Sequence, residues 1–422
     1  MNECVITGVG AVSAFGVGLG ALLGGLAEGM RAVGPIRHFD VTSFPTKVAG
    51  EVPVQDLDAG WLRAVGGLPG EHLEALAASG LLRDRKVGFA LVAAFEAWRA
   101  AGCADAEREA SLVLALGLEQ AFLEDFGPLM TPAGGLDFGA DAARAGPPVR
   151  LRSRVDLASE WVRRLLGLEG LPLVNVSACA AGGLAVAQGA ALIERGLASI
   201  VLAGGADSMV NPLGLGGMSR LGAPSPRAAP DACRPFDRRR DGLAIGEGAA
   251  VFVLESAARA RARGARPLAR VLGWGSTQDA YRVTAPRPDG ARARLAMQRA
   301  LTRARLAPEA VGYINAHGTG TPLNDPAEAQ AIAALFPRGV AVSSIKGAVG
   351  HLMAAAGALE LAACMLPFTR DLLPGTANHL ERDPACAIDV IGEAPRAARV
   401  DALMSNSFGF GGQNVAVVLG RA

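Results

Sequence analysis

The segment that decides the fold is Val174-Asn-Val-Ser-Ala-Cys-Ala-Ala-Gly-Gly183, in which an apolar run gives way to small residues. Residues 171–176 are apolar and partly β-branched, which is typical of a buried strand, whereas residues 180–194 are mostly helix formers and small residues. Cys179 is therefore predicted at a helix N-terminus, where unpaired N–H groups and the helix dipole would lower the thiol pKa. Most lone cysteines are only small buried hydrophobes, so a nucleophilic role requires a base elsewhere in the chain.

Two of the five histidines lie in segments of similar character. His317 is in segment 313–325, a predicted strand that runs into a loop of glycines and threonines able to hold a polar ligand. His351 is in segment 343–360, where a strand and a turn again lead into a helix of small residues. This repeated placement predicts an enzyme of two similar halves that face each other across a cleft. The other histidines are interpreted as surface or packing residues: His38, His72 and His379.

The composition is that of a globular enzyme. The chain has 422 residues, of which 50% are hydrophobic, and a formal net charge of +1, which gives no electrostatic reason to expect nucleic acid as a partner. Its six cysteines form no C-x-x-C pair and no Cys/His cluster, so we expect no metal site, no disulfide framework and a reducing, cytoplasmic location. The first residues are predicted to form a strand rather than a signal peptide, and no apolar run is long enough for a membrane span.

Strands alternate with helices along the chain, which predicts an α/β fold with buried parallel strands. Further strands are predicted at 4–12, 200–206, 249–254, 268–274, 313–316, 387–391 and 402–419, the last interrupted at 408–412. Helices are predicted at 87–101, 153–166, 290–304 and 326–335, and the tract 211–241, dense in Gly, Pro and Arg, is predicted to be rich in loops. A charged, alanine-rich segment at 256–266 is the best boundary, so we divide the chain into residues 1–260 and 261–422.

Lysine is rare in this chain and occurs only at positions 47, 86 and 346, while arginine supplies the other basic residues. Lys346 lies between His317 and His351 in the sequence, within segment 343–360, and this position suggests a need for a compact ammonium group rather than a guanidinium. Chance is the equal alternative at this stage.

In their order along the chain, these segments resemble the elongating, type II β-ketoacyl-acyl-carrier-protein synthases of the thiolase-fold superfamily. The likeness covers nearly the whole chain and rests on residues 5–13, 177–180, 233–242, 246–248, 315–325, 346–351 and 406–412. Each segment is a weak signal alone, but the ordered set is specific. The resemblance implies a thiolase-like fold, a five-layered α-β-α-β-α core made of two similar halves, which is normally paired into a dimer.

The resemblance also implies a reaction in two stages. Cys179 would accept the growing acyl chain from acyl carrier protein as a thioester. Malonyl carrier protein would then lose carbon dioxide, and the resulting carbanion would attack that thioester in a Claisen condensation. His317 and His351 match the pair that promotes decarboxylation by donating N–H bonds to the thioester oxygen. No cofactor is implied, because phosphopantetheine on the carrier protein holds the substrates.

Further roles follow from the same resemblance. Lys346 and Glu360 match an ion pair behind the histidines that would orient His351 rather than move protons. The backbone N–H groups of Cys179 and Phe410 would form an oxyanion hole, and the Phe410 side chain would gate the acyl pocket. The implied substrate-binding residues are Thr319, Thr321, Thr284, Phe408 and Arg220. The threonines would hold the phosphopantetheine arm, whereas Arg220 is either a contact for the acidic carrier protein or a solvated side chain.

Two departures from the family pattern leave the pathway open. Gln413 stands where the family usually has threonine, and the tract 112–147 lacks the usual landmarks of the acyl tunnel and dimer interface. The loop 219–226 is closer to polyketide-type synthases. Fatty-acid synthesis and polyketide or polyene synthesis therefore both remain possible, as do a homodimer and a heterodimer with a chain-length-factor-like subunit.

Two rival functions share this ancestry. A non-catalytic chain-length-factor-like subunit would lack the nucleophile, so Cys179 argues against it. A thiolase that uses coenzyme A would need a second active-site cysteine, and the candidates Cys364 and Cys386 lie outside a matching glycine-rich segment.

Overall fold

The strands form two sets with the same internal order. The computed structural model describes residues 2–68, 70–103, 108–117, 122–131, 137 and 154–422. The first set runs β1 (Cys4–Ser13), β8 (Ile245–Ser256), β7 (Ile200–Ser208), β5 (Ser111–Leu116) and β6 (Pro172–Asn175). The second set runs β9 (Ala269–Gln278), β16 (Gln413–Arg421), β15 (Ala402–Phe408), β10 (Tyr313–Asn315) and β11 (Ala341–Ser343), with β13 (Asp389–Val390) beyond it.

Strand directions repeat as well. In each set the first two pairings are antiparallel and the next two are parallel. The sets meet where residues 4–6 of β1 pair with residues 269–271 of β9, so hydrogen bonds continue from one set into the other. β1, β8, β7, β5 and β6 therefore correspond to β9, β16, β15, β10 and β11. The division of the chain at residue 260 stays a prediction, although it separates the two sets.

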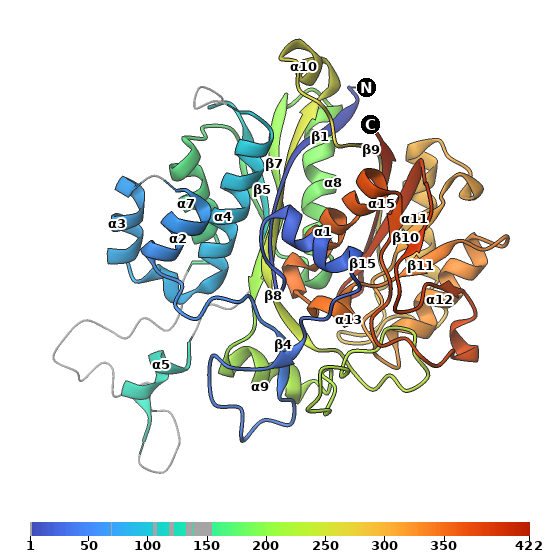
Figure 1. Ribbon diagram of the computed structural model, residues 1–422, viewed down its shortest axis with the longest axis horizontal. Coiled ribbons are helices and arrows are strands. Elements are labelled where there is room, and N and C mark those ends of the chain that lie inside the picture. Colours follow the sequence, from blue (N-terminus) through green and yellow to red (C-terminus); the bar gives the residue numbers. More distant parts are fainter. Residues whose placement is uncertain (1, 69, 104–107, 118–121, 132–136, 138–153) are drawn as a thin grey trace.

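Helices lie on both faces of each strand set and produce five layers (Figure 1). α4 (Arg85–Ala100) and α7 (Leu157–Leu166) pack on the outer face of the first set, and α11 (Ala291–Ala304) and α12 (Asn324–Leu335) on that of the second. α8 (Ala181–Glu194) and α14 (Ala356–Ala363) lie between the sets, because one core cluster joins them to strands of both halves. This is the predicted α-β-α-β-α order.

The remaining elements are short. The helices are α1 (Leu19–Ala27), α2 (Ala59–Gly66), α3 (Gly70–Ala78), α5 (Leu123–Phe126), α9 (Pro212–Arg220), α10 (Ala257–Ala262), α13 (Lys346–Val349) and α15 (Met365–Arg370). The strands are β2 (Gly16–Val17), β3 (Gly34–Pro35), β4 (Val48–Gly50), β12 (Leu372–Leu373) and β14 (Arg396–Ala397). Among the described residues, no helix has the length and apolarity needed to cross a lipid bilayer.

The tract 211–241, predicted to be rich in loops, begins with the helix α9, which the sequence analysis did not predict. The Asn211 side chain accepts a hydrogen bond from the Gly214 N–H at 2.9 Å, and Pro212 occupies the first helical position. An N-cap followed by proline favours a helix start over a loop. Of the divergent tract 112–147, β5 belongs to the first strand set, while residues 118–121, 132–136 and 138–147 lie outside the described residues, as does residue 153 of the helix predicted at 153–166.

The outer helices approach the sheet closely because glycines on the facing strands leave room for backbone contact. A Cβ atom at Gly10 of β1 would lie 2.0 Å from the Ala93 carbonyl oxygen of α4. In the second half, a Cβ atom at Gly275 of β9 would lie 2.3 Å from the Ala296 carbonyl oxygen of α11. In both matching strands, β1 and β9, a glycine therefore allows the outer helix to pack directly against the strand backbone.

These contacts predict that alanine is not tolerated at either glycine. Gly10→Ala and Gly275→Ala should each lower the free energy of unfolding by about 3 kcal/mol, because rigid backbone must move to admit the methyl group. Urea denaturation followed by circular dichroism measures the change. Gly20→Ala is the matched control, since no atom lies within 4 Å of the added Cβ. Equal stability of all three variants would contradict this account of the packing.

Candidate active site

Cys179 lies in a tight turn between β6 and α8. The turn, Ala178–Ala180, is a single 3-10 turn, and α8 begins directly after it at Ala181. Asn175 fixes the turn, because its Nδ2 donates to the Ala181 carbonyl at 3.1 Å and its Oδ1 accepts from the Ser177 hydroxyl at 2.6 Å. Ala178 has a φ of 47°, an unusual value for a residue with a side chain. Such strain persists only where the surroundings hold the backbone in place.

One cavity of about 190 Å³ brings together residues from both halves. Cys179 lines it from the first half, and His317 and His351 line it from the second. The predicted residues Phe408, Phe410, Thr284, Thr319 and Thr321 also line it. The geometric condition for a shared site is therefore met: the thiol and both imidazoles face the same space.

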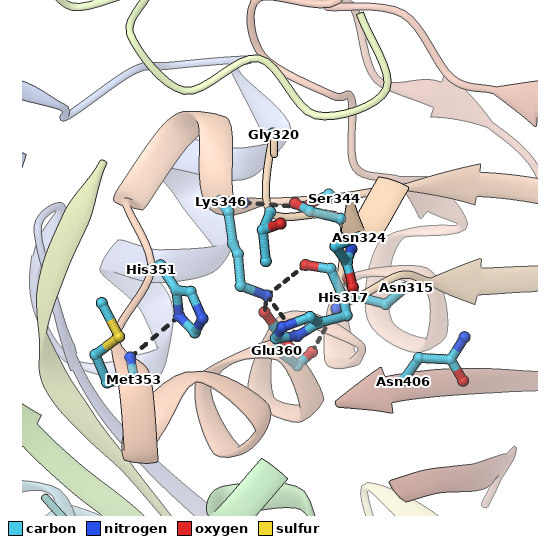
Figure 2. Close-up of polar contacts among 12 residues, drawn as sticks. Asn315, His317, Gly320, Asn324, Ser344, Lys346, His351, Met353, Glu360 and Asn406 are labelled. Carbon is cyan, nitrogen blue, oxygen red and sulfur yellow. Dashed lines mark hydrogen bonds and ion pairs between the residues drawn. The ribbon is translucent and has the colours of Figure 1, made fainter. Parts of the chain in front are cut away.

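The first half of the chain holds His351 in place, although His351 belongs to the second half. The His351 N–H donates to the Ala244 carbonyl at 2.8 Å, and the His351 carbonyl accepts from the Gly246 N–H at 2.9 Å. Its ring atom Nδ1 accepts from the Met353 N–H at 3.1 Å (Figure 2). An acceptor Nδ1 leaves the proton on Nε2, so the neutral ring is a hydrogen-bond donor at Nε2.

Lys346 sets the tautomer of His317. The Lys346 Nζ lies 3.2 Å from His317 Nδ1 and donates to the His317 carbonyl at 2.6 Å (Figure 2). Because an ammonium group only donates, Nδ1 must accept, and Nε2 again carries the proton. The two imidazole rings are 5.2 Å apart at an interplanar angle of 82°. Burial, assisted by the positive charge of Lys346, holds the pKa of both histidines well below 6.5.

The Lys346–Glu360 ion pair is present but orients a different histidine from the one expected. Lys346 and Glu360 form a buried ion pair, and their side chains are 1% and 2% exposed. Lys346 contacts His317, whereas the His351 ring is held by the Met353 N–H of its own turn. The predicted orientation of His351 by this pair is therefore wrong. Burial, opposed by Lys346, raises the pKa of Glu360 to about 7.

The expectation of a lowered thiol pKa is also wrong for this structure. Cys179 is 6% exposed and packs in an apolar cluster, and burial raises its pKa to about 11. A hydrogen bond from the Phe410 N–H and the charge of Lys346 oppose this rise, while Asp207 and Glu360 reinforce it. The thiol is thus protonated near neutral pH and must lose its proton when it reacts.

Two backbone N–H groups lie beside the thiol. The Phe410 N–H hydrogen-bonds to Cys179, which places the loop 409–412 against the thiol. A Cβ atom at Gly409 would lie 3.2 Å from the Cys179 nitrogen, so glycine is needed for this close approach. Gly411 and Gly412 have φ values of 87° and 82° and allow the loop to turn back into β16. The Cys179 and Phe410 amides are therefore close enough to serve one oxyanion.

The predicted binding residues separate into two groups. The hydroxyls of Thr319 and Thr321 are 2.9 Å apart and line the cavity, as Thr284 does. The Phe408 ring packs 5.9 Å from the His317 ring. Arg220 is exposed at the end of α9 and does not line the cavity, although the next residue, Leu221, does.

Sequence reasoning missed the polar layer behind the histidines. Glu328 accepts hydrogen bonds from the N–H groups of His317 and Gly318 at 2.9 and 2.8 Å. Oxygen atoms of Asn315, Asn406 and Glu360 are buried without a hydrogen-bond partner among the described residues, and Figure 2 shows Glu360 beside Lys346. An ordered water or a hard cation would suit such oxygens. The described residues contain no cluster of three or more His, Cys, Asp or Glu side chains fit for a metal ion, and the absence of a metal stays a prediction.

Asp207 was also missed as a site residue, although the sequence places it directly after a predicted strand. Its Oδ2 accepts from the Ala354 N–H at 2.7 Å. Polar residues at strand ends were a usable signal here, as they were for His317.

The fold and the cavity define an acyltransferase built on the thiolase fold. Residues 1–260 match the family description "Beta-ketoacyl synthase, N-terminal domain", and residues 268–380 match "Beta-ketoacyl synthase, C-terminal domain". This chain belongs to the beta-ketoacyl synthase family.

Similar proteins extend over the full chain. The 3-oxoacyl-[acyl-carrier-protein] synthase 2 of Synechocystis sp. is 34% identical over 430 residues, covering 98% of this chain and 97% of its own. The tetracenomycin polyketide synthase ketoacyl synthase alpha subunit of Streptomyces glaucescens is 35% identical, covering 100% and 97%. A beta-ketoacyl synthase structure from Burkholderia phymatum has a TM-score of 0.85 and 32% identity, and covers 100% of both chains.

The buried neutral histidines predict a pH dependence of stability. Because the pKa of His351 in the folded protein lies well below 6.5, only the unfolded chain takes up this proton as the pH falls below 6.5. His351 therefore makes the folded protein less stable as the pH falls, and His351→Gln removes this pH dependence. Below pH 6.5 the stability of the natural protein relative to His351→Gln should fall by about 1.4 kcal/mol per pH unit.

Urea denaturation of both proteins at several pH values between about 5.5 and 7.5 provides the measurement. Glu360 has the opposite effect on stability. Its pKa is about 7 in the folded protein, against 4.5 in the unfolded chain, so the stability that its bound proton contributes declines as the pH rises from 4.5 to 7. It is present in both proteins and cancels in the difference. A pH-independent difference would show that the His351 imidazole is charged or exposed in the folded protein.

Proposed function

We propose that this chain is a β-ketoacyl-acyl-carrier-protein synthase in which Cys179, His317 and His351 catalyse decarboxylative Claisen condensation. One observation carries the proposal: a thiol from one half and two neutral imidazoles from the other line the same cavity. A nucleophile that accepts an acyl group and donors that stabilise an enolate are the two requirements of this chemistry.

The first stage is acyl transfer to Cys179. The thiol sulfur attacks the carbonyl of an acyl-carrier thioester, and the phosphopantetheine thiol leaves with the proton given up by Cys179. The N–H groups of Cys179 and Phe410 would donate to the oxyanion that forms on the carbonyl oxygen. Because burial raises the pKa of Cys179 to about 11, this loss of a proton must accompany attack.

The second stage is decarboxylation and carbon–carbon bond formation. The Nε2–H groups of His317 and His351 would donate to the malonyl thioester oxygen as carbon dioxide leaves and negative charge moves onto that oxygen. The resulting carbanion attacks the Cys179 thioester, and collapse of the intermediate frees the cysteine sulfur. Lys346 holds His317 in the donating tautomer, whereas the Met353 N–H does so for His351.

Acyl carrier protein is the proposed source of both substrates. The exposed side chains of Leu221 and Leu323 line the cavity, and the exposed Arg220 precedes Leu221 in the chain. Exposed apolar side chains and a positive charge suit an acidic protein that delivers a long arm into the cavity. One similar structure, 26% identical with a TM-score of 0.85, is titled as a type II acyl-carrier protein in complex with its ketosynthase. Thr284, Thr319 and Thr321 would hydrogen-bond the phosphopantetheine arm, so the enzyme needs no cofactor of its own.

A second subunit is proposed at the β6 edge. β6 ends the strand order, and the apolar side chains of Leu171 and Val176 beside it are 52% and 43% exposed. An exposed edge strand with apolar flanks favours pairing with another chain. A similar structure, 32% identical with a TM-score of 0.85, is titled as a ketosynthase/chain length factor. The partner is therefore either an identical copy or a chain-length-factor-like subunit, and co-purification distinguishes them.

The proposed pathway is fatty-acid or polyketide synthesis, and the proposed location is the cytoplasm. Relatives named for acyl-carrier-protein synthesis and for polyketide synthesis are 34% and 35% identical, so identity does not separate the two. Loading of saturated and of conjugated acyl carrier thioesters onto Cys179 would do so. The six cysteines are free thiols, which supports a reducing, cytoplasmic setting.

The rival functions fit the cavity less well. A non-catalytic chain-length-factor-like subunit would have no need of Cys179 opposite two histidines. A thiolase would place a second cysteine in the cavity, but Cys364 and Cys386 are buried elsewhere and do not line it.

Cys179→Ala should abolish acylation and condensation while leaving the fold intact, because it removes only one sulfur atom beside a helix start. Mass spectrometry of protein incubated with acyl carrier thioesters should show the acyl adduct on the Cys179 peptide. Cys386→Ala is the matched control, since this buried cysteine lies outside the cavity and its loss should leave the adduct in place. An adduct on another residue would refute the assignment.

His351→Ala should retain acylation of Cys179 but lose malonyl decarboxylation by about 100-fold or more, the usual size of losing one oxyanion donor. Release of labelled carbon dioxide from malonyl carrier protein and the acyl adduct on Cys179 are measured on the same protein sample. His72→Ala, on α3 away from the cavity, controls for the loss of an imidazole. Decarboxylation at the natural rate in His351→Ala would show that the assigned role is wrong.

A further inference from the structure

A second cavity, of about 500 Å³, lies at the end of the strand order opposite to β6. β13 and the end of α12 form two of its walls, on the side of the molecule away from α7 (Figure 1). Its volume is within the range of about 300 to 1,000 Å³ that is usual for small-molecule sites. Among the described residues it shares no lining residue with the cavity of Cys179, and a second subunit at the β6 edge would leave it open.

The floor of this second cavity is apolar. Ile332 and Phe336 at the end of α12, Val340 before β11 and Val390 of β13 line it, and each is at most 9% exposed. The same side chains belong to the apolar cluster that packs α12 against the second strand set. The apolar part of a ligand would therefore lie against the edge of this cluster and leave water.

Two carboxylates line the cavity, and each already has an arginine partner. Asp389 accepts hydrogen bonds from both Nη atoms of Arg396, at 2.6 and 2.9 Å. Asp383 forms an ion pair with Arg240 and accepts from the Ala385 N–H at 2.9 Å. Each pair has no net charge, so neither carboxylate gives a reason to expect a cation as the ligand.

Arg382 supplies a charge that is not compensated in this way. It lines the cavity and is exposed, and a β-bridge to Asp237 fixes its backbone. Among the described residues no hydrogen bond or ion pair occupies its guanidinium group. Its influence on Asp389 is a longer-range one, because both oxygens of that carboxylate are bonded to Arg396.

Two further ionisable groups that line the cavity add no charge. Burial lowers the pKa of His379 from 6.5, so its imidazole is neutral at pH 7, and burial raises the pKa of Cys386 to about 12. The described groups around the cavity are thus two neutral ion pairs, two neutral side chains and Arg382. Their sum is one positive charge, placed at an exposed residue above an apolar floor.

We propose that this cavity binds an amphiphilic carboxylate, a monoanion with a short apolar tail. The carboxylate would bind the guanidinium group of Arg382, whose planar fork matches its geometry, and the tail would lie on the apolar floor. A dianion such as a phosphate monoester suits the site less well, because Asp383 and Asp389 would repel its second charge. The site does not depend on the proposed function, since no residue of the catalytic cavity takes part.

Octanoate is the probe for this site, and isothermal titration calorimetry of the full-length protein measures its binding. Octanoate should bind about three- to ten-fold more tightly than octan-1-ol, which has the same tail without the charge, because an ion pair near solvent contributes only modestly. Octyl phosphate should bind more weakly than octanoate. Absence of octanoate binding, or equal affinities for the acid and the alcohol, would overturn the proposal.

Arg382→Gln tests the charged end of the site. It should weaken octanoate binding about three- to ten-fold and leave the affinity for octan-1-ol unchanged. Arg338→Gln is the matched control, since Arg338 is 83% exposed and adjoins the lining residues Pro337 and Gly339 but does not line the cavity. Equal weakening by both substitutions would mean that octanoate responds only to the overall surface charge, and would refute a specific site.

Ala333→Trp tests the apolar end, because the indole would fill the cavity from α12. Binding of octanoate should be lost. Ala334→Trp is the matched control: Ala333 and Ala334 are both exposed on α12, so both variants should fold, but only Ala333 lines the cavity among these two. Octanoate binding that is unaffected by Ala333→Trp would place the ligand elsewhere and overturn the proposal.

An octanoate analogue with a diazirine at the end of its tail locates the bound molecule directly. After irradiation, mass spectrometry should find the label within residues 332–340 or 379–390, which contain the lining residues. Label found only at residues of the Cys179 cavity would mean that octanoate binds there as a substrate mimic, and would refute the second site. If Cys179 failed to accept an acyl group, the proposed function would fail, while the labelling result would still decide this proposal.

Discussion

The site depends on one contact: the pairing of the His351 backbone with the strand β8 of the other half. The N–H and carbonyl of His351 bond to Ala244 and Gly246, so a residue of the second half is held as if it were part of the first. In the described part of the chain the strand sets also meet along β1 and β9, and the His351 pairing brings the imidazole to the cavity that Cys179 lines. A rotation of one half against the other would separate Cys179 from His317 and His351.

Burial gives the three reactive groups a common charge state. The same exclusion of water that raises the pKa of Cys179 to about 11 holds the pKa of both histidines well below 6.5. All three are therefore neutral near pH 7. Neutral imidazoles donate without the repulsion that two adjacent imidazolium ions would create, and a neutral thiol can share an apolar cavity with an acyl chain. The charges are placed one layer away, in Lys346, Glu360 and Asp207.

The sequence predicted some of the site residues and missed others, and each error has a physical cause. Strand ends and glycine-rich turns, which are local features, pointed to Cys179, His317 and His351, and the family resemblance added Phe408 and the threonines; all of them line one cavity. Sequence reasoning assigned the wrong histidine to Lys346, since a five-residue separation in the chain says nothing about which ring the ammonium faces. It missed α9, whose helix depends on a single asparagine cap, and it overlooked Asp207, whose partner lies 147 residues away.

The sequence by itself determined the alternation of strands and helices and the similar placement of Cys179, His317 and His351 at strand ends and turns. These are consequences of local patterns: apolar runs, small-residue helices and glycines at turns. Only the tertiary structure decided the protonation states, because the pKa of a thiol or an imidazole depends on how much water and which charges surround it. It also decided the tautomers of His317 and His351, which are set by a lysine and by a backbone N–H that reach the rings only after the chain has folded.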